Sequence, residues 1–421
     1  MTSTISATAL AALADEPLDW RFKGLPAGWS GRTSAEICAA RPQLFDAGPL
    51  GPICVLDAGA LAHNVATMAR WCADRGVQLA PHGKTHMSPQ LCAKQLEAGA
   101  CAITAATISQ VRTFRAFGVS AVVLANQLVD LAGLRWLSAE LDADPNFDLV
   151  CWVDSVRGVE IMTAELAAAG AVRPVDVCVE VGAAGGRTGC RTDSLVDEVA
   201  RAAAASPRLR LVGVAGYEAA LGHDVSSGGR ELVRDYLQCM RSAVYRLAGE
   251  FESDEVMVTA GGSTHFDLVA DTLASGWRDG LTVRTILRSG AYLTHDDGLY
   301  RRTSPLTRPG ARQATLLPAL SVWAQVCSRP EPDLAFLTLG RRDVAFDQDL
   351  PLPRALPESV VTKLNDQHAF LQLGSGDADR VGVGTWLEFG ISHPCTVFDK
   401  WQLIPVLDND FRVVELIRTF F

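Results

Sequence analysis

The chain has 421 residues, of which 48% are hydrophobic and 20% charged, a composition typical of a globular protein with a large core rather than a disordered chain. Its formal net charge is −10 and it has no long run of Lys or Arg, which argues against nucleic acid or an anionic membrane as the main partner. Neither a signal peptide nor a membrane span is expected, because the N-terminus has no basic segment and its apolar run is short.

The eleven cysteines are scattered along the chain, are odd in number and include no CxxC pair. This pattern predicts reduced thiols and a cytoplasmic protein rather than a disulfide framework. We expect most of these cysteines to be small buried hydrophobic residues.

Residues 1–45 are expected to form a loosely ordered or helical N-terminal extension. A first apolar run at 51–56 precedes a helical pattern that Asp57 can cap. Eight further apolar runs follow, and each but the last precedes a helical stretch: 77–81, 100–106, 119–126, 147–154, 175–181, 209–217, 254–262 and 282–290. Eight continuous apolar strands that alternate with helices predict a closed α/β fold, a (β/α)8 TIM barrel over residues 46–300. An open doubly wound sheet is the alternative, but no GxGxxG turn follows the first strand.

Residues 301–421 have a different pattern, with clustered prolines and short apolar runs separated by turn residues. The runs cover 317–326, 334–340, 368–374, 385–390 and 401–408. Short strands at this spacing predict a C-terminal antiparallel β domain.

Lys84 follows the first barrel strand in the stretch LAPHGKTHMSPQL, residues 79–91. By strand alternation, His82 and Lys84 share a phase with Ala80 that is expected to face the barrel interior. Active sites of such barrels lie at the C-terminal rim of the strands, where an inward lysine needs a charged partner or a covalent role. A lysine at the protein surface is the alternative.

The seventh strand ends in TAGGSTHF, which places Gly262, Ser263 and Thr264 before a helical run. Glycines let backbone N–H groups approach an anion, and a phosphate site after strands seven and eight is common in this fold. The alternative is an ordinary turn with Ser263 or Thr264 as a helix cap.

A phosphate-bearing cofactor beside an inward lysine suggests pyridoxal 5′-phosphate held as a Schiff base. Arg187, Tyr217 and Tyr292 lie in the loops expected after strands five, six and eight. Each of these three residues either lines the cofactor site or is a structural polar residue.

The C-terminal domain contains EFGISHPCTVFDKW, in which His393 and Cys395 are two positions apart. In an extended segment these side chains would project from the same side, and Pro394 would stiffen the backbone between them. Imidazole and thiolate are donors that suit zinc. Two ligands are too few for a structural zinc site, but a catalytic divalent metal can use open positions for water or substrate.

Taken together, these motifs resemble the D-serine dehydratase and D-threonine aldolase group of fold-type III pyridoxal phosphate enzymes, which share the alanine racemase barrel. The resemblance covers nearly everything after residue 45. PHGKTH is similar to the segment whose lysine binds the cofactor, which implies this role for Lys84 and a place beside the cofactor for His82. The resemblance further implies that Gly262, Ser263 and Thr264 hold the phosphate, and that Arg187 and Tyr217 contact the cofactor. It also implies that His393 and Cys395 bind the metal and that His368 lines the same pocket as a catalytic residue.

The resemblance favours a lyase that removes the β-hydroxyl of a small D-3-hydroxy amino acid, D-serine first, to give a keto acid and ammonia. A D-threonine-type aldolase, which would release glycine and an aldehyde, is the nearest alternative. An amino-acid racemase needs no leaving-group metal, and a noncatalytic pyridoxal phosphate carrier resembles the bare barrel. The family also implies a homodimer.

Overall fold

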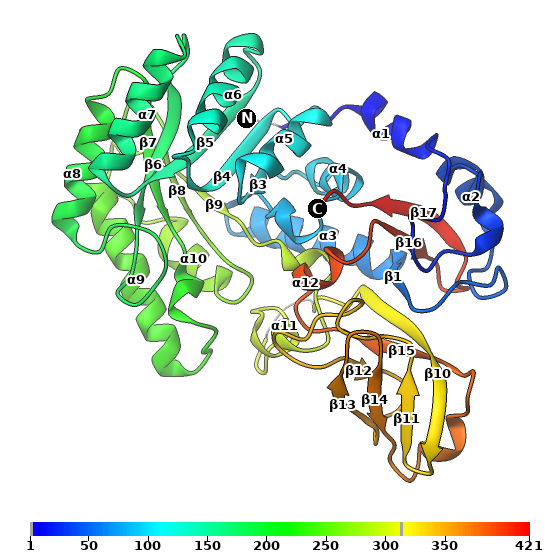
Figure 1. The fold of residues 1–421 in the computed structure, drawn as a ribbon. Coiled ribbons are helices and arrows are strands. Elements are labelled where there is room, and N and C mark those ends of the chain that lie inside the picture. Colours follow the sequence, from blue (N-terminus) through cyan, green and yellow to red (C-terminus); the bar gives the residue numbers. More distant parts are fainter. Residues whose placement is uncertain (1–2, 312–314) are drawn as a thin grey trace. The chain divides into compact units, whose positions relative to one another are not determined.

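The computed structural model describes residues 3–311 and 315–421 (Figure 1). Contacts between residues divide the described chain into two compact units. The barrel unit comprises residues 3–6, 69–84 and 95–290, and the sheet unit comprises residues 7–68, 85–94, 291–311 and 315–421.

The barrel unit is built on an eight-stranded sheet in which every pair of neighbouring strands is parallel. Its strands are β2 (Gln78–Leu79), β3 (Ile103–Ala105), β4 (Ala121–Gln127), β5 (Asp148–Val153), β6 (Val175–Val181), β7 (Leu209–Gly216), β8 (Val256–Ala260) and β9 (Val283–Leu287). The sheet order runs from β2 through β9, β8, β7, β6, β5 and β4 to β3. A parallel bridge between His82 and Thr104 and a 2.8 Å bond from the Cys101 amide to the Leu79 carbonyl join the two ends. The predicted (β/α)8 barrel is therefore confirmed, strand by strand.

Helices connect these strands, and most begin within a few residues of the strand before them. They are α4 (Pro89–Glu97), α5 (Ile108–Ala116), α6 (Leu131–Ala143), α7 (Val156–Ala168), α8 (Asp193–Ala204), α9 (Ser227–Arg246) and α10 (Phe266–Leu273), while α3 (Ala58–Asp74) precedes β2. Residues 58–68 of α3 and 89–94 of α4 belong to the sheet unit. Five of these helices start at a side chain that accepts a backbone N–H of the first turn, from Thr107, Asp130, Ser155, Thr192 and Ser226. Such caps satisfy amides that have no partner inside the helix and so fix where each helix begins.

The barrel interior is filled by small and β-branched side chains around one large aromatic residue. Ala80 and Trp152, which are 0% and 2% exposed, belong to this cluster together with Val123, Ala215 and Ile286. Since Ala80 faces the interior, the strand phase predicted for this segment is correct as far as residue 80.

The sheet unit contains nine strands: β1 (Ile53–Asp57), β10 (Leu320–Glu331), β11 (Leu334–Leu337), β12 (Leu352–Pro353), β13 (Val360–Leu364), β14 (Ala369–Gln372), β15 (Trp386–Gly390), β16 (Leu403–Leu407) and β17 (Val413–Arg418). The main path runs β13-β14-β11-β10-β1-β16-β17, and β15 pairs with β10 and β12. All five predicted strands of the C-terminal domain are present, as β10, β11, β14, β15 and β16. The β domain is mostly antiparallel, with one parallel pair between β1 and β16.

The N-terminal segment is part of the sheet unit's core. It forms α1 (Ala7–Ala14), a 3₁₀ turn at Ala27–Trp29 and α2 (Ser34–Ala40), where Thr33 and Glu36 make a capping box. Trp29 and Ile37 are 4% and 0% exposed and pack in one cluster with residues of β1, β16 and β17. The remaining short elements are α11 (Leu299–Thr303), α12 (Cys395–Phe398) and 3₁₀ turns at Gly83–Thr85, Glu218–Leu221, Ala291–Leu293 and Ala378–Arg380.

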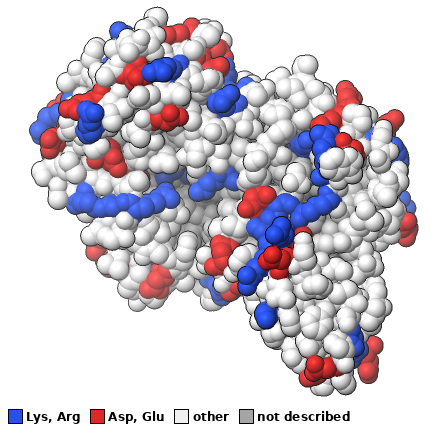
Figure 2. Space-filling model, viewed as in Figure 1, with Lys and Arg blue, Asp and Glu red and all other residues white. Residues whose placement is uncertain are grey.

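Acidic and basic side chains are interspersed over the face shown in Figure 2. Within the described residues, no helix combines the length and apolar character that crossing a membrane requires.

Candidate functional site

Lys84 lies in a one-turn 3₁₀ helix, Gly83–Thr85, rather than in a strand. The strand that precedes it has only two residues, so strand alternation does not determine the direction of the lysine, and the inward orientation of Lys84 stays a prediction. The turn is seated by Gly83, where an added Cβ would lie 2.5 Å from Phe114 Cζ and 2.8 Å from Ile103 Cγ2. Close packing on α5 and β3 therefore fixes the backbone next to Lys84.

Three cationic side chains surround His82, which is bonded through its backbone to β3. Burial and the positive charges of Lys84, Arg288 and Arg187 together hold the pKa of His82 well below its ordinary value. The imidazole is therefore neutral at neutral pH, while the buried carboxylates of Glu180 and Glu218 lie near Arg288. Three cations, one of them a lysine, suit a ligand with a phosphate group.

Arg288 is a member of this group that the sequence prediction missed. It is 6% exposed and its guanidinium donates to Thr259 Oγ1 at 2.5 Å and to the Gly216 carbonyl at 2.6 Å. The signal in the sequence was a charge directly after the apolar pair Ile286–Leu287 at the end of a strand, because a buried arginine requires partners.

The glycine loop after β8 is held by a buried carboxylate. Glu218, 0% exposed, accepts the amide N–H of Gly261 at 2.9 Å and of Gly262 at 2.6 Å. Gly261 has φ +100°, a conformation that favours glycine, and a Cβ on Gly262 would lie 3.1 Å from Tyr217 Cε2, which is a tight contact. Glu218 was also missed by the sequence prediction, which considered only Tyr217 beside it.

The residues that follow the loop do not act as helix caps. α10 begins after His265, which makes no side-chain capping bond, and the Thr264 hydroxyl instead bonds His223 Nδ1 at 2.7 Å. His265, and not Ser263 or Thr264, therefore occupies the N-cap position of α10.

Arg187 and Tyr217 lie against each other, with the guanidinium carbon 4.3 Å from the ring centroid. Arg187 belongs to the loop after β6, which is braced by Arg191, whose guanidinium donates to the carbonyls of Thr188 and Gly189 at 2.9 and 3.2 Å. Together with the contact of Gly262 with Tyr217, this links the arginine loop to the glycine loop.

Pyridoxal phosphate fits these residues of the barrel unit. Side chains at Gly261 and Gly262 would fill the space beside the glycine loop, the nearby cations favour a phosphate, and Lys84 carries an amine for covalent attachment. The amides of Gly261 and Gly262 already donate to Glu218, so a phosphate would use the amides that follow them. The residues that would hold the cofactor are Lys84, His82, Arg187, Arg288, Tyr217 and the loop 261–264.

The other predicted residues belong to the sheet unit. Tyr292 is 3% exposed in the 3₁₀ turn Ala291–Leu293. His368 is solvent-exposed in the turn between β13 and β14, where its carbonyl accepts the Asn365 amide at 2.8 Å.

His393 and Cys395 come together, but not in an extended segment as predicted. His393 has φ +66° and Pro394 begins a helical turn, so Cys395 is the first residue of α12. The left-handed residue reverses the chain, and proline is well suited to the start of a helix. The His393 amide donates to Asp296 Oδ2 at 2.9 Å, which holds this backbone conformation.

The imidazole of His393 has two acidic neighbours. Burial alone would lower its pKa, but hydrogen bonding and charge from Cys395 and Asp347 outweigh burial and raise the pKa to about 9. Asp347 Oδ2 is 2.5 Å from His393 Nδ1, and the Cys395 thiol donates to the Thr85 hydroxyl at 3.4 Å. Nε2 is then the nitrogen that remains for a metal ion.

The donor set fits a divalent metal with open coordination positions. Imidazole nitrogen and thiolate sulfur suit zinc, and no group of three or more His, Cys, Asp or Glu side chains arranged for a metal occurs among residues 3–311 and 315–421. A metal here would have His393 and Cys395 as protein ligands, with its other positions open to water or substrate.

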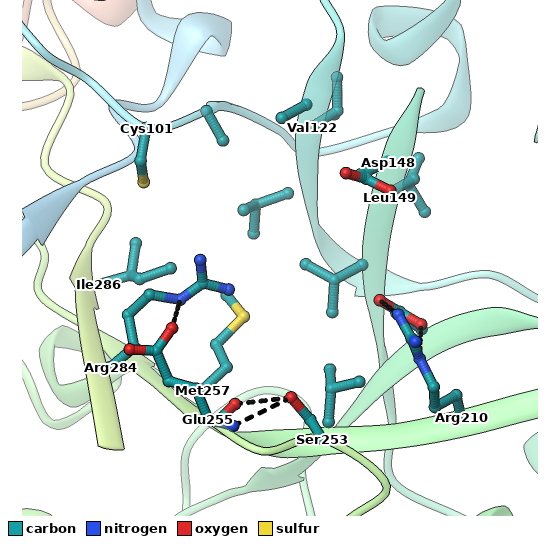
Figure 3. A pocket seen from close by; sticks show the side chains of 16 residues that line it. Cys101, Val122, Asp148, Leu149, Arg210, Ser253, Glu255, Met257, Arg284 and Ile286 are labelled. Atoms are coloured by element: carbon teal, nitrogen blue, oxygen red, sulfur yellow. Dashed lines mark hydrogen bonds and ion pairs between the residues drawn. The ribbon is translucent and has the colours of Figure 1, made fainter. Parts of the chain in front are cut away.

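A cavity of about 90 Å³ lies in the barrel unit at the N-terminal ends of the strands, whereas Lys84 and the glycine loop follow the C-terminal ends (Figure 3). Its charged residues lie at or near strand starts and form ion pairs: Asp176 with Arg210 at 2.7 Å, Glu255 with Arg284 at 3.4 Å and Asp148 with Arg173 at 3.3 Å. Since each charge is neutralised within the protein, the cavity gives no indication of a charged ligand.

Family comparisons agree with the two-unit architecture. The alanine racemase N-terminal domain matches residues 56–310, and the putative serine dehydratase domain matches residues 319–407. The second match includes His393 and Cys395.

Among curated relatives, D-threonine aldolase of Arthrobacter sp. is 27% identical over 358 residues, covering 83% of this chain and 86% of the relative. D-threo-3-hydroxyaspartate dehydratase of Delftia sp. (strain HT23) is 26% identical over 393 residues, covering 86% and 95%.

Solved structures show the same fold. D-threonine aldolase from Filomicrobium marinum superposes with a TM-score of 0.75 at 23% identity, covering 88% of this chain and 95% of that one. The Delftia dehydratase, as a cysteine-to-alanine variant in the metal-free form, gives a TM-score of 0.68 at 23% identity, covering 88% and 97%. Since the barrel match spans more than half of the chain, the chain belongs to the alanine racemase N-terminal domain family and, with its serine dehydratase domain, to the fold-type III pyridoxal phosphate-dependent lyases of the D-threonine aldolase and D-serine dehydratase type.

Proposed function

We propose that the chain is a pyridoxal phosphate- and metal-dependent lyase that eliminates the β-hydroxyl of a D-3-hydroxy amino acid, with D-serine as the leading substrate. The products would be a keto acid and ammonia. The two relatives act, by their names, on D-threonine and D-threo-3-hydroxyaspartate, which supports a D-amino acid with a 3-hydroxyl group as the substrate class.

The main observation in support of the proposed dehydratase is that His393 and Cys395 are paired. Both residues are partly buried, and the raised pKa of His393 arises in part from its bond to the cysteine. The Cys395 thiol also bonds Thr85, the residue that directly follows Lys84 in the chain. A cysteine-to-alanine variant of the Delftia dehydratase was solved in a metal-free form, which supports the presence of a metal ion in that dehydratase.

The residues of the chain would divide the work. Lys84 Nζ would bind the cofactor, and once displaced by the substrate amine it would take the proton from the substrate Cα. Arg187, Arg288 and the loop 261–264 would orient the cofactor, while neutral His82 would add no further positive charge. Bound pyridoxal phosphate supplies an electron sink for the electrons left on Cα.

Hydroxide is a poor leaving group, and the proposed role of His393 and Cys395 follows from this. A divalent metal ion on these two residues, with zinc as the first choice, supplies a Lewis acid to the β-hydroxyl, which is worth several kcal/mol in typical enzymes. His368, exposed in the single chain, stays a proposed proton-transfer residue.

Aldol cleavage is the second candidate, because a D-threonine aldolase is among the relatives. It would use the same metal on the hydroxyl but would break the Cα–Cβ bond. The test is to incubate purified enzyme with D-serine, L-serine and D-threonine, before and after chelation.

Metal-dependent pyruvate and ammonia from D-serine, with none from L-serine, is the expected result. Glycine and acetaldehyde from D-threonine without pyruvate from D-serine would assign the enzyme as an aldolase instead. Pyruvate release that is unaffected by chelation would contradict the role given to His393 and Cys395.

We also propose that the enzyme is a cytoplasmic homodimer. All eleven cysteines are free thiols, which supports a reducing compartment. Light scattering of the purified enzyme is expected to give twice the mass of one chain, and a monomer would contradict the dimer.

A further inference from the structure

Asp347 contacts the proposed metal segment through both of its carboxylate oxygens. Oδ2 is 2.5 Å from His393 Nδ1, and Oδ1 accepts the Thr396 hydroxyl at 2.7 Å. His393 and Thr396 stand on either side of Cys395 in the chain, so one carboxylate is bonded to both ends of the turn that carries the thiol. Asp347 comes from the segment between β11 and β12, far from His393 in sequence, and no motif pointed to it.

Both the backbone and the imidazole ring of His393 are held by hydrogen bonds to other residues. The left-handed backbone of His393, with φ +66°, is held by the bond from its amide to Asp296. The ring is held by Asp347, which accepts a hydrogen bond from Nδ1–H and so leaves Nε2 as the nitrogen for a metal ion. A carboxylate in this position also makes the opposite nitrogen a stronger donor.

Orientation matters more here than in a site with many ligands. A metal ion bound only by His393 and Cys395 has two protein ligands. If one of these side chains is misplaced, half of the metal–protein bonds are lost. We infer that Asp347 is a positioning residue of the metal site: it fixes the Nδ1-protonated form and the direction of the His393 ring, so that Nε2 and the Cys395 sulfur face the same ion. This inference rests on the proposed metal site.

A simple surface ion pair is the alternative explanation of the contact. The side chains of His393 and Asp347 are 23% and 39% exposed, and pairs at such exposure typically contribute little to stability. The two explanations differ in what they predict for metal binding, since a surface pair could be removed without effect on the affinity for a metal ion.

A neighbouring carboxylate provides a matched control. Asp349 lies two residues further on and has the same charge, but its partners are Arg302 at 2.8 Å and the Ser392 hydroxyl at 2.7 Å. Asp349→Asn removes the same charge from the same segment without removing a partner of the imidazole.

The experiment compares the native protein with the variants Asp347→Ala, Asp347→Asn and Asp349→Asn after removal of metal. The affinity for Zn²⁺ is measured by competition with a chromophoric chelator, and the coordination geometry is read from the visible spectrum of the Co²⁺ form. We expect Asp347→Ala to weaken Zn²⁺ binding by roughly 10- to 100-fold and to alter the Co²⁺ spectrum, as is typical when the outer partner of a ligating histidine is removed. Asp349→Asn should stay within about threefold of native on the same reasoning.

Asp347→Asn keeps an oxygen that can accept a hydrogen bond from Nδ1–H but loses the negative charge. We expect a loss of Zn²⁺ affinity between those of native protein and Asp347→Ala. This variant carries the test if Asp347→Ala proves unfolded by circular dichroism. Native affinity and an unchanged Co²⁺ spectrum in the Asp347 variants would overturn the positioning role alone, while the metal site would stand. Failure of the native protein itself to bind Zn²⁺ or Co²⁺ would overturn the metal site, and the inference with it.

Discussion

Glu218 shows how one buried carboxylate can define a loop. It satisfies two consecutive amides of the glycine loop, at Gly261 and Gly262, and no solvent reaches it. Hydrogen bonds to a charged group contribute more than neutral ones, and a buried amide left without a partner is costly. The loop conformation that would receive the cofactor phosphate therefore depends on this side chain.

The substitution Glu218→Gln keeps the shape of the side chain but places an amide N–H donor against one of the two backbone donors. We expect a loss of about 1.5–3 kcal/mol in the free energy of unfolding and faster loss of pyridoxal phosphate on dialysis. Denaturant unfolding and the visible absorption of the dialysed protein are the two measurements. Glu231→Gln, at a side chain that is 65% exposed, is the control and should change neither. A Glu218→Gln protein as stable and as well loaded as native would show that the loop does not need the carboxylate.

Among the structural elements, the 3₁₀ turn Gly83–Thr85 marks the point after which strand alternation no longer predicts the direction of side chains. The barrel strands were predictable because continuous apolar runs of the right length recur between helices. Lys84 follows β2 in the chain, as expected, but its direction depends on how Gly83 packs against Phe114, a contact that no local pattern encodes.

Gly83→Ala tests this packing. An added Cβ would lie 2.5 Å from an aromatic carbon of Phe114, so the turn must shift. Overpacking of this kind costs about 1–3 kcal/mol, and a displaced turn should also slow covalent loading of pyridoxal phosphate at Lys84. The control is Gly249→Ala, where nothing lies within 4 Å of the added atom. Equal stability and loading rates in the two variants would show that the turn tolerates movement.

In the segment with His393 and Cys395, the sequence also predicted the residues but not their backbone conformation. The residue types and their spacing identified His393 and Cys395, yet the extended backbone expected between them is a left-handed residue followed by a helical turn. Asp347, Arg288 and Glu218 were not predicted because each becomes a partner only through the tertiary fold. The charge of Arg288 at a strand end was visible in the sequence, but hydrogen-bond partners that are distant in the chain are not.

For the whole molecule, buried ionisable groups link stability to pH. His295 is 1% exposed, and burial together with Arg301 lowers its pKa from 6.5 to about 4. The unfolded chain therefore takes up a proton near pH 6.5 that the folded protein takes up only near pH 4. Stability contributed by the neutral histidine is complete above pH 6.5 and is lost as the pH falls toward 4, by about 3 kcal/mol in total.

The variant His295→Asn removes this proton uptake, and asparagine tolerates the left-handed backbone of the residue, φ +49°. We expect the difference in unfolding free energy between native and variant to shift by about 3 kcal/mol in favour of the variant from pH 7 to pH 4. Urea unfolding at several pH values measures it. Parallel pH profiles for the two proteins would mean that His295 is not held neutral.

The change of pattern near residue 300 predicted a separate β domain, but the sheet unit also includes residues 7–68 and 85–94, which the prediction had assigned to an N-terminal extension and to the barrel. The proposed enzyme requires both units, one to hold pyridoxal phosphate and the other to carry the metal ligands. That requirement is the central claim.

The most direct test of this claim is keto acid release from D-serine by the Cys395→Ala variant, with its cofactor load read from visible absorption in the same sample. The cofactor residues are unchanged in this variant, so the absorption should equal that of native enzyme. Keto acid release should fall by roughly 100-fold or more, since the leaving group loses its Lewis acid. Full cofactor load with undiminished keto acid release would contradict the account, because elimination would then not need the metal pair.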